Sequence, residues 1–357
     1  MPDADQVTPR HDVLVLLSFG GPERPEDVVP FLRNVTRGKN IPDERLAEVG
    51  EHYYGFGGRS PINDQNKALL AALRAELAGR GVDLPVVWGN RNWEPYLTDA
   101  LREAHEAGAR RVLVLTTSAY SSYSGCRQYR EDVARSLAEL AEEGRELEVD
   151  QVQRYAGSTG FVQGNADAVR AALQRVTEQP SRLVFVTHSI PTAMADTAGP
   201  DGGAYVAQHE GVAARVADEV GADGWDLVYC SRSGPPTQRW LEPDVNDHLR
   251  DLHARGVRSV VLAPIGFVSD HMEVVYDLDT EAAATGEELG LQVVRAGTVG
   301  TDPAFVSSLV DLVLHRTGVA PAPAAALRGL PSVHDACPVG CCPNLRGEQP
   351  AACGASR

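Results

Sequence analysis

Short runs of apolar residues recur along the chain and are separated by longer segments with apolar residues three or four positions apart. A short continuous run is typical of a buried parallel strand, and the wider spacing is typical of a helix. The runs predict strands at 12–18, 86–88, 111–116, 148–151, 183–187, 225–229, 259–263 and 291–295. The wider spacing predicts helices at 61–77, 97–107, 128–141, 160–177, 244–255 and 303–317, and one that ends at 220.

The alternation of strands and helices predicts an α/β fold made of two similar Rossmann-like lobes, each a parallel sheet flanked by helices. We expect an N-terminal lobe at 12–157 and a C-terminal lobe with the chemistry-bearing residues at 158–317. Residues 318–330 are rich in Ala and Pro and read as a linker. The remainder, to residue 357, is a short Cys-rich extension.

Polar residues gather where the predicted strands end. In open α/β sheets, ligands bind beyond the carboxyl ends of the strands. The polar segments at those ends are 18–19, 117–129, His188, 231–233 and 269–273. His188 and Glu273 each follow a strand, and an imidazole–carboxylate pair can move protons near neutral pH or hold a divalent metal. We therefore expect the functional site between these segments.

The stretch 264–281 carries Glu273, Asp277 and Glu281 at intervals of four residues. On an α-helix, residues with this spacing share one face, where like charges repel. Two interpretations follow from the pattern alone. The three carboxylates form a solvated acidic face, or they form a ladder that handles a cation or protons.

Composition narrows the classes of partner. The chain has 357 residues, a formal net charge of −16 and 43% hydrophobic residues, which is enough for two ordinary cores. The acidic balance argues against nucleic acid or an anionic membrane as the main partner. The sequence shows neither an apolar signal region nor a membrane-spanning run. We expect a cytoplasmic protein, and we expect a monomer because no helical pattern indicates an interface.

Six cysteines are present, and four of them lie within the last 21 residues. In a reducing compartment, such clustering indicates metal or redox chemistry in place of a disulfide framework. A four-thiolate zinc site and a redox-reactive tail without a ligand are both open interpretations. The six are Cys126, Cys230, Cys337, Cys341, Cys342 and Cys353.

Five motifs in collinear order make the chain resemble the ferrochelatase family, the enzymes that insert ferrous iron into a porphyrin. The resemblance covers residues 12–317. The most specific of the motifs is Gly-Phe-Val-Ser-Asp-His-Met-Glu, which ends at Glu273. The others are Leu-Leu-Ser-Phe-Gly-Gly-Pro (16–22), Gly-Gly-Arg-Ser-Pro (57–61), Thr-His-Ser-Ile-Pro (187–191) and the segment 231–236 with Trp240 and Leu241.

The resemblance implies a porphyrin cleft between two lobes, with Fe(II) as a substrate. It places His188 and Glu273 on opposite sides of the macrocycle, as iron ligands or as acceptors of the pyrrole protons, and Asp277 and Glu281 on a path for iron or protons. It implies that Phe19 lies against the macrocycle where other members carry Tyr. The residues that it implies for substrate contact are Phe19, His52, Ser60 and Tyr129, with Arg37, Tyr53 and Arg59 as weaker candidates.

The resemblance also implies a cofactor and a substrate. Some members carry a [2Fe–2S] cluster on one mid-chain and three C-terminal cysteines, which match Cys126, Cys337, Cys341 and Cys342. Cys353 is an alternative to Cys341 or Cys342. A tail without a membrane segment resembles enzymes that act on coproporphyrin III. The alternatives are protoporphyrin IX, a porphyrin or haem carrier without turnover, and a chelatase for cobalt or nickel.

Overall fold

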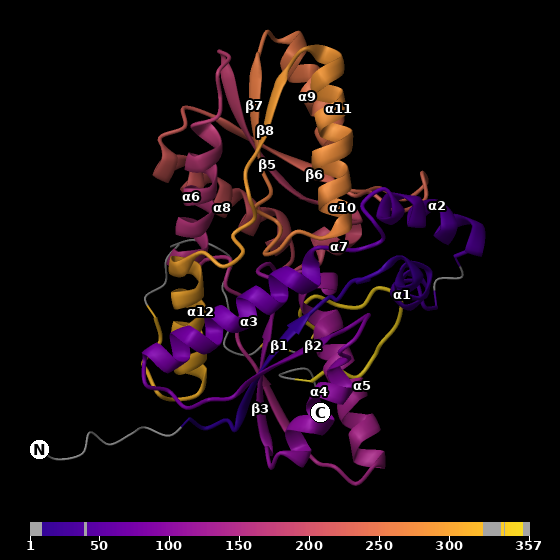
Figure 1. Ribbon diagram of the computed structural model, residues 1–357, viewed down its shortest axis with the longest axis vertical. Coiled ribbons are helices and arrows are strands. Elements are labelled where there is room, and N and C mark those ends of the chain that lie inside the picture. Colours follow the sequence, from indigo (N-terminus) through magenta and orange to yellow (C-terminus); the bar gives the residue numbers. More distant parts are fainter. Residues whose placement is uncertain (1–8, 39–40, 324–336, 339, 353–357) are drawn as a thin grey trace, which may run out of the picture.

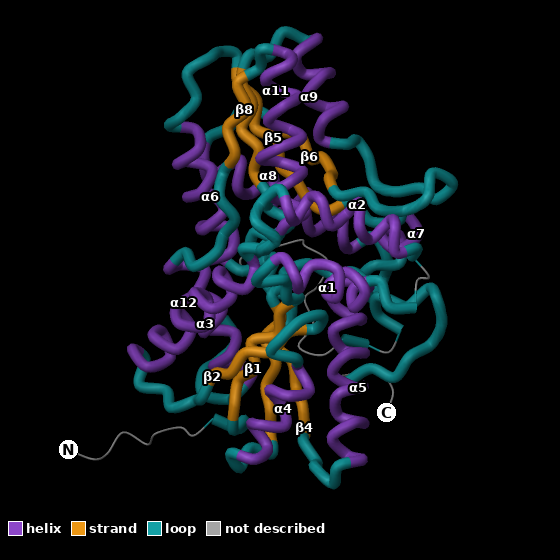
Figure 2. Tube along the Cα trace, turned by 45° about the vertical axis from the view of Figure 1, so that its right-hand side comes forward, coloured by secondary structure: helices purple, strands orange, loops and turns teal. Residues whose placement is uncertain are grey.

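The structure is a computed structural model that describes residues 9–38, 41–323, 337–338 and 340–352. Its eight strands form two four-stranded sheets, and all neighbouring strands are parallel (Figures 1 and 2). The first sheet has the order β2-β1-β3-β4, with strands β1 (Val13–Ser18), β2 (Val86–Asn90), β3 (Arg111–Thr116) and β4 (Glu148–Gln151). The second has the order β6-β5-β7-β8, with strands β5 (Ser181–His188), β6 (Trp225–Cys230), β7 (Ser259–Ala263) and β8 (Gln292–Arg295).

Helices flank both sheets. In the first half these are η1 (Pro25–Asp27), α1 (Val28–Val35), α2 (Asp43–Tyr54), α3 (Ile62–Gly79), α4 (Leu97–Glu106), the π-helical turn η2 (Tyr123–Arg127) and α5 (Gln128–Glu142). In the second half they are α6 (Thr159–Leu173), α7 (Thr192–Asp196), α8 (Ala204–Val220), α9 (Val245–Ala254), α10 (Met272–Val275), the π-helical η3 (Tyr276–Glu281), α11 (Ala282–Leu289) and α12 (Pro303–Arg316).

The central strands are apolar on both faces, which is why they read as continuous runs. All six residues of β1 are buried, and so are all five of β7. A strand covered by helices on both sides needs apolar side chains in both directions. The predicted α/β fold with two parallel sheets is therefore confirmed.

Two predicted helices differ from the observed ones. The helix predicted at 160–177 ends at Leu173, although Val176 still packs against the core from the following loop, which mimics the helical spacing. The run after Met272 is α-helical only to Val275 and then π-helical to Glu281. The wider π turn changes the angular spacing of the acidic residues from that of an ideal α-helix.

The loops at the carboxyl ends of the two sheets face each other across the molecule (Figure 2). Tyr120, which follows β3, donates its hydroxyl hydrogen to the carbonyl of Ile265, which follows β7, at 3.0 Å. The side chain of Gln208 on α8 accepts from the backbone N–H of Ser121 at 2.8 Å. Residues that sit at strand ends in either half are thereby brought to one region between the sheets.

The last long helix joins the two halves. α12 packs against α6 of its own half and against α3 of the first half (Figure 1). One cluster of buried side chains accordingly runs through both sheets, from Leu14 and Leu113 to Phe185 and Val261. The domain boundaries expected near residues 157 and 317 stay a prediction.

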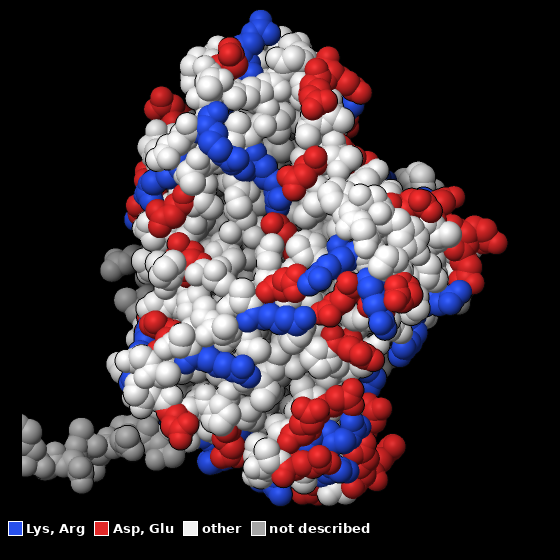
Figure 3. All heavy atoms as spheres, viewed as in Figure 1, with Lys and Arg blue, Asp and Glu red and all other residues white. Residues whose placement is uncertain are grey.

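The C-terminal extension runs along α5 (Figure 1). The backbone N–H of Ala352 donates to the carbonyl of Arg130 at 2.9 Å, and Arg127 donates to the carbonyl of Gln349 at 2.9 Å. On the face drawn in Figure 3, basic and acidic side chains are interspersed, and acidic ones gather around the ends of α2 and α4. In the part of the chain that the structure describes, no helix is long and apolar enough to cross a membrane.

Candidate functional site

His188 and Glu273 come together between the sheets. His188 is the last residue of β5, and Glu273 lies in α10, which follows the loop after β7. Their side chains approach to 3.4 Å between His188 Nε2 and Glu273 Oε2, with 31% and 52% of the side-chain surfaces exposed. The pair predicted from two distant motifs is thus assembled at the carboxyl ends of the strands, and it is open to an incoming molecule.

The hydrogen bonds of His188 determine where its proton sits. Its Nδ1 lies 2.5 Å from the carbonyl oxygen of Ser189, which can only accept, so Nδ1 carries a hydrogen. Nε2 therefore faces Glu273, and a proton between the two atoms is favourable. Burial lowers the pKa of His188, but the hydrogen bond and negative charge of Glu273 outweigh it and raise the pKa above its ordinary value. The pair can hold a proton at Nε2 or, without that proton, offer a nitrogen and an oxygen ligand to a metal ion.

Asp277 is a second carboxylate, close enough to Glu273 for their charges to interact. Ser231, whose backbone has a positive φ of 61°, donates its hydroxyl hydrogen to Asp277. Burial and the charges of Glu273 and Glu281 together raise the pKa of Asp277 to about 6, although the hydrogen bond from Ser231 acts in the opposite direction. The three carboxylates therefore interact with one another despite the π-helical turn, and the solvated-face interpretation does not describe Asp277.

The first lobe supplies aromatic side chains, among them Phe19 and Phe31, that pack in one cluster with Met272, the residue before Glu273. Phe19, which follows β1, meets Phe31 edge to face with ring centroids 6.3 Å apart. Arg91, which follows β2, lies 4.4 Å from the ring centroid of Tyr129 and 5.7 Å from that of Phe19. Its guanidinium also pairs with the buried Asp132. Phe19 and Tyr129 are thus tied to one buried arginine, which the sequence reasoning missed although it stands at a strand end.

The other residues predicted to contact the substrate are Ser60, His52, Tyr53, Arg37 and Arg59. Ser60 is buried, and its N–H donates to the carbonyl of Pro22 at 2.9 Å. His52 stacks on Tyr276 of η3 with ring centroids 3.8 Å apart and planes 4° apart, which brings α2 against the acidic segment. Burial raises the pKa of Tyr53, and the charge of Glu273 adds to that rise. Arg37 instead donates to Asn34, and Arg59 pairs with the exposed Asp64.

Two further residues that the sequence reasoning missed hold the acidic segment in place. Arg295, at the end of β8, pairs with Asp270 and with Asp279, the second at 2.7 Å. Gln65 on α3 accepts from the N–H of Asp270 at 2.8 Å and donates to its carboxylate at 3.3 Å. Asp270 is therefore engaged on both sides and anchors the segment that leads to Glu273. In the sequence, the only signal for Arg295 and Gln65 was that each is a polar residue near the end of a predicted strand or helix.

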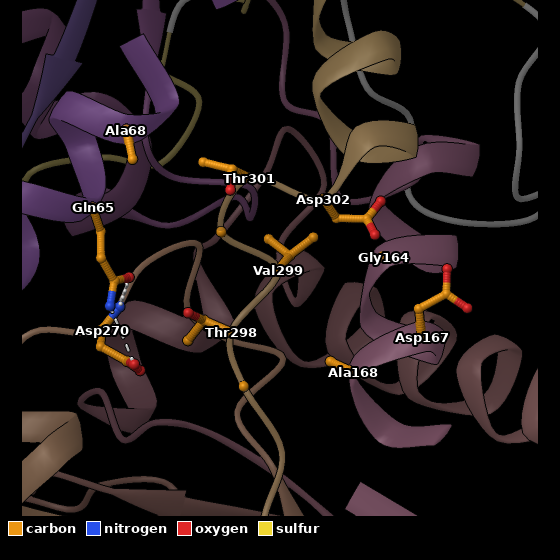
Figure 4. A pocket seen from close by; sticks show the side chains of 12 residues that line it. Gln65, Ala68, Gly164, Asp167, Ala168, Asp270, Thr298, Val299, Thr301 and Asp302 are labelled. Carbon is orange, nitrogen blue, oxygen red and sulfur yellow. Dashed lines mark hydrogen bonds between the residues drawn. The ribbon is translucent and has the colours of Figure 1, made fainter. Parts of the chain in front are cut away.

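A cavity of about 590 Å³ adjoins this anchor. Figure 4 shows Gln65 and Asp270 hydrogen-bonded at one end and Asp167 and Asp302 at the other. Asp302 accepts from backbone N–H groups at the start of α12, and Asp167 pairs with Arg170 at 2.5 Å. The carboxylates that line the cavity are thus occupied by structural contacts, and the predicted site residues lie outside it.

Buried polar residues of α8 form hydrogen bonds with the end of β5, where His188 lies. Tyr205 on α8 donates to the carbonyl of His188 at 2.8 Å. Nδ1 of His209 donates to the carbonyl of Tyr205 at 2.7 Å, so its Nε2 accepts from the hydroxyl of Thr187 at 2.8 Å. Burial lowers the pKa of His209 to about 3, which keeps this imidazole neutral. The end of β5 is therefore held by hydrogen bonds to the carbonyl of His188 and to the side chain of Thr187.

The cysteines form a second cluster, next to the first lobe. Cys126 in η2 lies 3.8 Å, Sγ to Sγ, from Cys337 of the extension, and Cys341 lies 3.8 Å from Cys342. These four pack as one group of free thiols, and the backbone N–H of Gly199 donates to Cys342 Sγ at 3.1 Å. Hydrogen bonds from Cys337 and Cys342 lower the pKa of Cys341 to about 4. Cys353 lies outside the described residues, and Cys230 is a buried thiol in the core of the second lobe.

Within the described ranges, no group of three or more His, Cys, Asp or Glu side chains could hold a metal ion as the side chains stand. The four thiols nevertheless come from two segments that are far apart in sequence, since Cys126 and Cys337 are separated by 211 positions. The predicted set Cys126, Cys337, Cys341 and Cys342 is therefore brought together by the fold.

Comparison with solved structures identifies the class of fold. A sirohydrochlorin chelatase from Bacillus subtilis subspecies spizizenii, solved with cobalt, superposes with a TM-score of 0.51 over 88% of this chain and 99% of that one, at 11% sequence identity. An identity this low bears on the fold alone. Two parallel sheets whose carboxyl ends face each other thus define a chelatase-like α/β protein.

Sequence comparison identifies the family. The family model described as Ferrochelatase matches residues 11–317, so the chain belongs to the ferrochelatase family of metal-chelating lyases. A coproporphyrin III ferrochelatase from Streptomyces coelicolor is 57% identical over 375 aligned residues, covering 99% of each chain. One from Leifsonia xyli is 52% identical, covering 96% of this chain and 94% of that one. A protein from Rhodopirellula baltica named ferrochelatase is 48% identical, covering 94% of each.

Proposed function

We propose that this protein inserts Fe(II) into coproporphyrin III to form iron coproporphyrin III in haem biosynthesis. The observation that carries the proposal is the His188–Glu273 pair, 3.4 Å apart and partly exposed between the sheets, in a chain more than half identical to proteins named coproporphyrin III ferrochelatase. Iron is a substrate in this reaction, and it leaves with the porphyrin.

In the proposed mechanism, His188 and Glu273 do the chemistry that metal insertion requires. Two pyrrole N–H protons must leave the macrocycle while Fe(II) exchanges its water for ring nitrogens. His188 Nε2 and Glu273 Oε2 accept protons or bind the ion before transfer. Asp277, whose pKa of about 6 lies close to neutral, passes protons between Glu273 and Glu281. The site thus contains groups, among them His188 and Asp277, whose protonation changes near physiological pH.

The porphyrin itself would be held by the first lobe. We propose that Phe19 lies against the macrocycle and that Ser60, His52 and Tyr129 contact its carboxylates. Phe19 cannot ligate iron, so axial ligation from this side is not expected. Because His52 stacks on Tyr276 of the acidic segment, α2 would contact both that segment and the substrate.

We further propose a [2Fe–2S] cluster on Cys126, Cys337, Cys341 and Cys342. Four gathered thiols are the donor set that such a cluster uses, and the group supplies a one-electron redox centre when bound. By holding the cluster, the four cysteines would tie the C-terminal extension to the segment after β3. Iron and acid-labile sulfide in the purified protein, with visible absorption lost in Cys337→Ser, are the expected result. A colourless protein that contains zinc would refute the cluster. We also propose a cytoplasmic monomer with lobes at 12–157 and 158–317.

The function is tested by paired metallation assays. Fe(II) is supplied anaerobically with coproporphyrin III or with protoporphyrin IX, and porphyrin absorbance is followed. We expect faster turnover of coproporphyrin III, and a loss of about a hundredfold or more in kcat for His188→Ala and Glu273→Gln. Tyr54→Ala, on the exposed face of α2, is the matched control. Faster metallation of protoporphyrin IX would overturn the substrate, and binding of porphyrin without insertion would make the protein a carrier.

A further inference from the structure

A buried arginine lies beside the cysteine cluster without a carboxylate partner. Arg154 follows β4, and only 6% of its surface is exposed. Its Nη1 donates to the carbonyls of Ser118 and Gly125, both at 2.9 Å. Among the described residues, no carboxylate pairs with it. An arginine remains charged at any physiological pH, so a positive charge is buried at this position.

The position of this charge is set by the loop that carries Cys126. Ser118 and Gly125 belong to the segment between β3 and α5, and Gly125 immediately precedes Cys126 in η2. By holding two carbonyls of one loop, the guanidinium stays next to the first thiol of the cluster. Arg130 of α5, which is also buried, donates to the carbonyl of Cys341 at 3.2 Å on the other side. Two guanidinium groups therefore flank the thiols from two elements.

The carboxylate that follows Arg130 in α5 is paired with other groups. Glu131 is paired with Arg127 at 3.3 Å and accepts from Tyr123 at 3.0 Å. Buried charges in proteins are paired, because desolvation of an isolated ion is costly. The set of four cysteines can supply a negative charge beside Arg154, because Gly125, whose carbonyl Arg154 binds, directly precedes Cys126. Four thiolates around two ferric ions and two sulfides carry a net charge of minus two, whereas four protonated thiols carry none.

We infer that Arg154 is the charge-compensating residue of an anionic four-thiolate centre, and that it sets how firmly that centre is held and how readily it accepts an electron. The inference rests on the proposed cofactor and goes beyond it, because it assigns a function to a residue outside the ligand set. A positive charge close to the centre stabilises each added negative charge. Its removal therefore weakens retention of the centre and lowers its reduction potential.

Two substitutions separate charge from hydrogen bonding. Arg154→Gln keeps a donor for the loop carbonyls and loses the charge. Arg154→Lys keeps the charge and loses the fork geometry. The matched control is Arg74→Gln, because Arg74 likewise donates to a backbone carbonyl, that of Val86, at the opposite end of the first sheet. Circular dichroism verifies that each variant is folded.

The readouts are iron and sulfide per chain after gel filtration with a chelator, and the midpoint potential in a titration with dithionite. We expect Arg154→Gln to lose at least half of its iron and sulfide and to show a lower midpoint potential. Arg154→Lys and Arg74→Gln should stay close to the unsubstituted protein. An Arg154→Gln protein with unchanged content and potential would overturn the inference while leaving the cofactor in place.

The same experiment separates this inference from the proposed cofactor. If the unsubstituted protein contains zinc in place of iron and sulfide, the [2Fe–2S] proposal fails. The four-thiolate zinc centre is also an anion, so zinc retention against the chelator becomes the readout for Arg154→Gln, with loss supporting the inference and retention refuting it. If the unsubstituted protein holds neither group, both proposals are wrong.

Discussion

At the scale of single residues, neighbouring charges decide what each titratable group does. His188 and Asp277 are both partly buried near Glu273, yet their roles differ. The pKa of His188 is raised by a carboxylate partner, so proton binding stabilises the folded state. The pKa of Asp277 is raised by burial and by like charges, so its ionised form is unfavourable. Asp277 therefore has a cost in stability that only a function in the site explains.

Substitution of this residue makes the cost measurable. Asp277→Asn should raise the free energy of unfolding at pH 7 by about 2 kcal/mol, because the folded pKa of Asp277 lies near 6 and its ordinary value is 3.8. Between these two values the native protein binds more protons than the unfolded chain, so wild-type stability falls as pH rises from about 4 to 6. The gain should thus be ~1 kcal/mol smaller at pH 5.

Urea denaturation at pH 5 and pH 7 checks this expectation. Asp247→Asn is the control, because Asp247 is 78% exposed and forms a surface pair with Arg250. An equal gain at both pH values would show that Asp277 is not the titrating group.

At the scale of elements, the segment from Asp270 to Glu281 depends on contacts from outside itself. α10 is four residues long and η3 is six, so neither is stable alone. Arg295 of β8 binds Asp270 at one end and Asp279 at the other, and His52 of α2 stacks on Tyr276 between them. The orientation of Glu273 therefore depends on two other elements, β8 and α2.

Removal of the arginine should loosen this segment without touching the substrate. Arg295→Met should lower kcat for iron insertion about tenfold or more, because small displacements of a reacting group are costly, with little change in the KM for the porphyrin. Arg250→Met, which removes an exposed pair of the same type, serves as the comparison in the same steady-state assay. A kcat within twofold of that of Arg250→Met would contradict the assignment of Arg295 as a positioning residue.

At the scale of the whole molecule, the two halves are less separate than the repeating pattern suggests. α12 is the last helix of the second half, but it packs against α3 of the first. α6 approaches it so closely that a Cβ added to Gly160 would lie 2.0 Å from the carbonyl oxygen of Ala304. The position of one half relative to the other depends on the contact of α12 with α3, and α6 holds α12 in place for that contact.

A single methyl group should separate these two helices. Gly160→Ala should lower the free energy of unfolding by about 3 kcal/mol, because the new Cβ meets a backbone atom that cannot turn away. Gly79→Ala at the end of α3 meets nothing within 4 Å and should be neutral or slightly stabilising. Urea unfolding of both variants is the measurement. A Gly160→Ala protein as stable as Gly79→Ala would mean that α6 and α12 can move apart freely.

Much of this organisation follows from local chemistry. Continuous apolar runs such as 13–17 are typical of strands covered on both sides, so the central strands and the α/β class were predictable. The helix expected to reach residue 177 ended at 173, because Val176 packs against the core from a loop without being helical. Periodicity detects burial, and burial does not specify the backbone.

The sequence by itself determined the fold class, the family motifs and the proximity of residues at strand ends, since parallel strands bring their carboxyl ends to one edge. Tertiary structure alone decided the partners of the polar residues outside those motifs. Arg91, Gln65, Arg295 and Arg154 lie far along the chain from the residues that they contact, and no periodic pattern marks them. The role of a buried charge or amide depends on the group with which it pairs. The packing of elements that are distant in sequence determines which group that is.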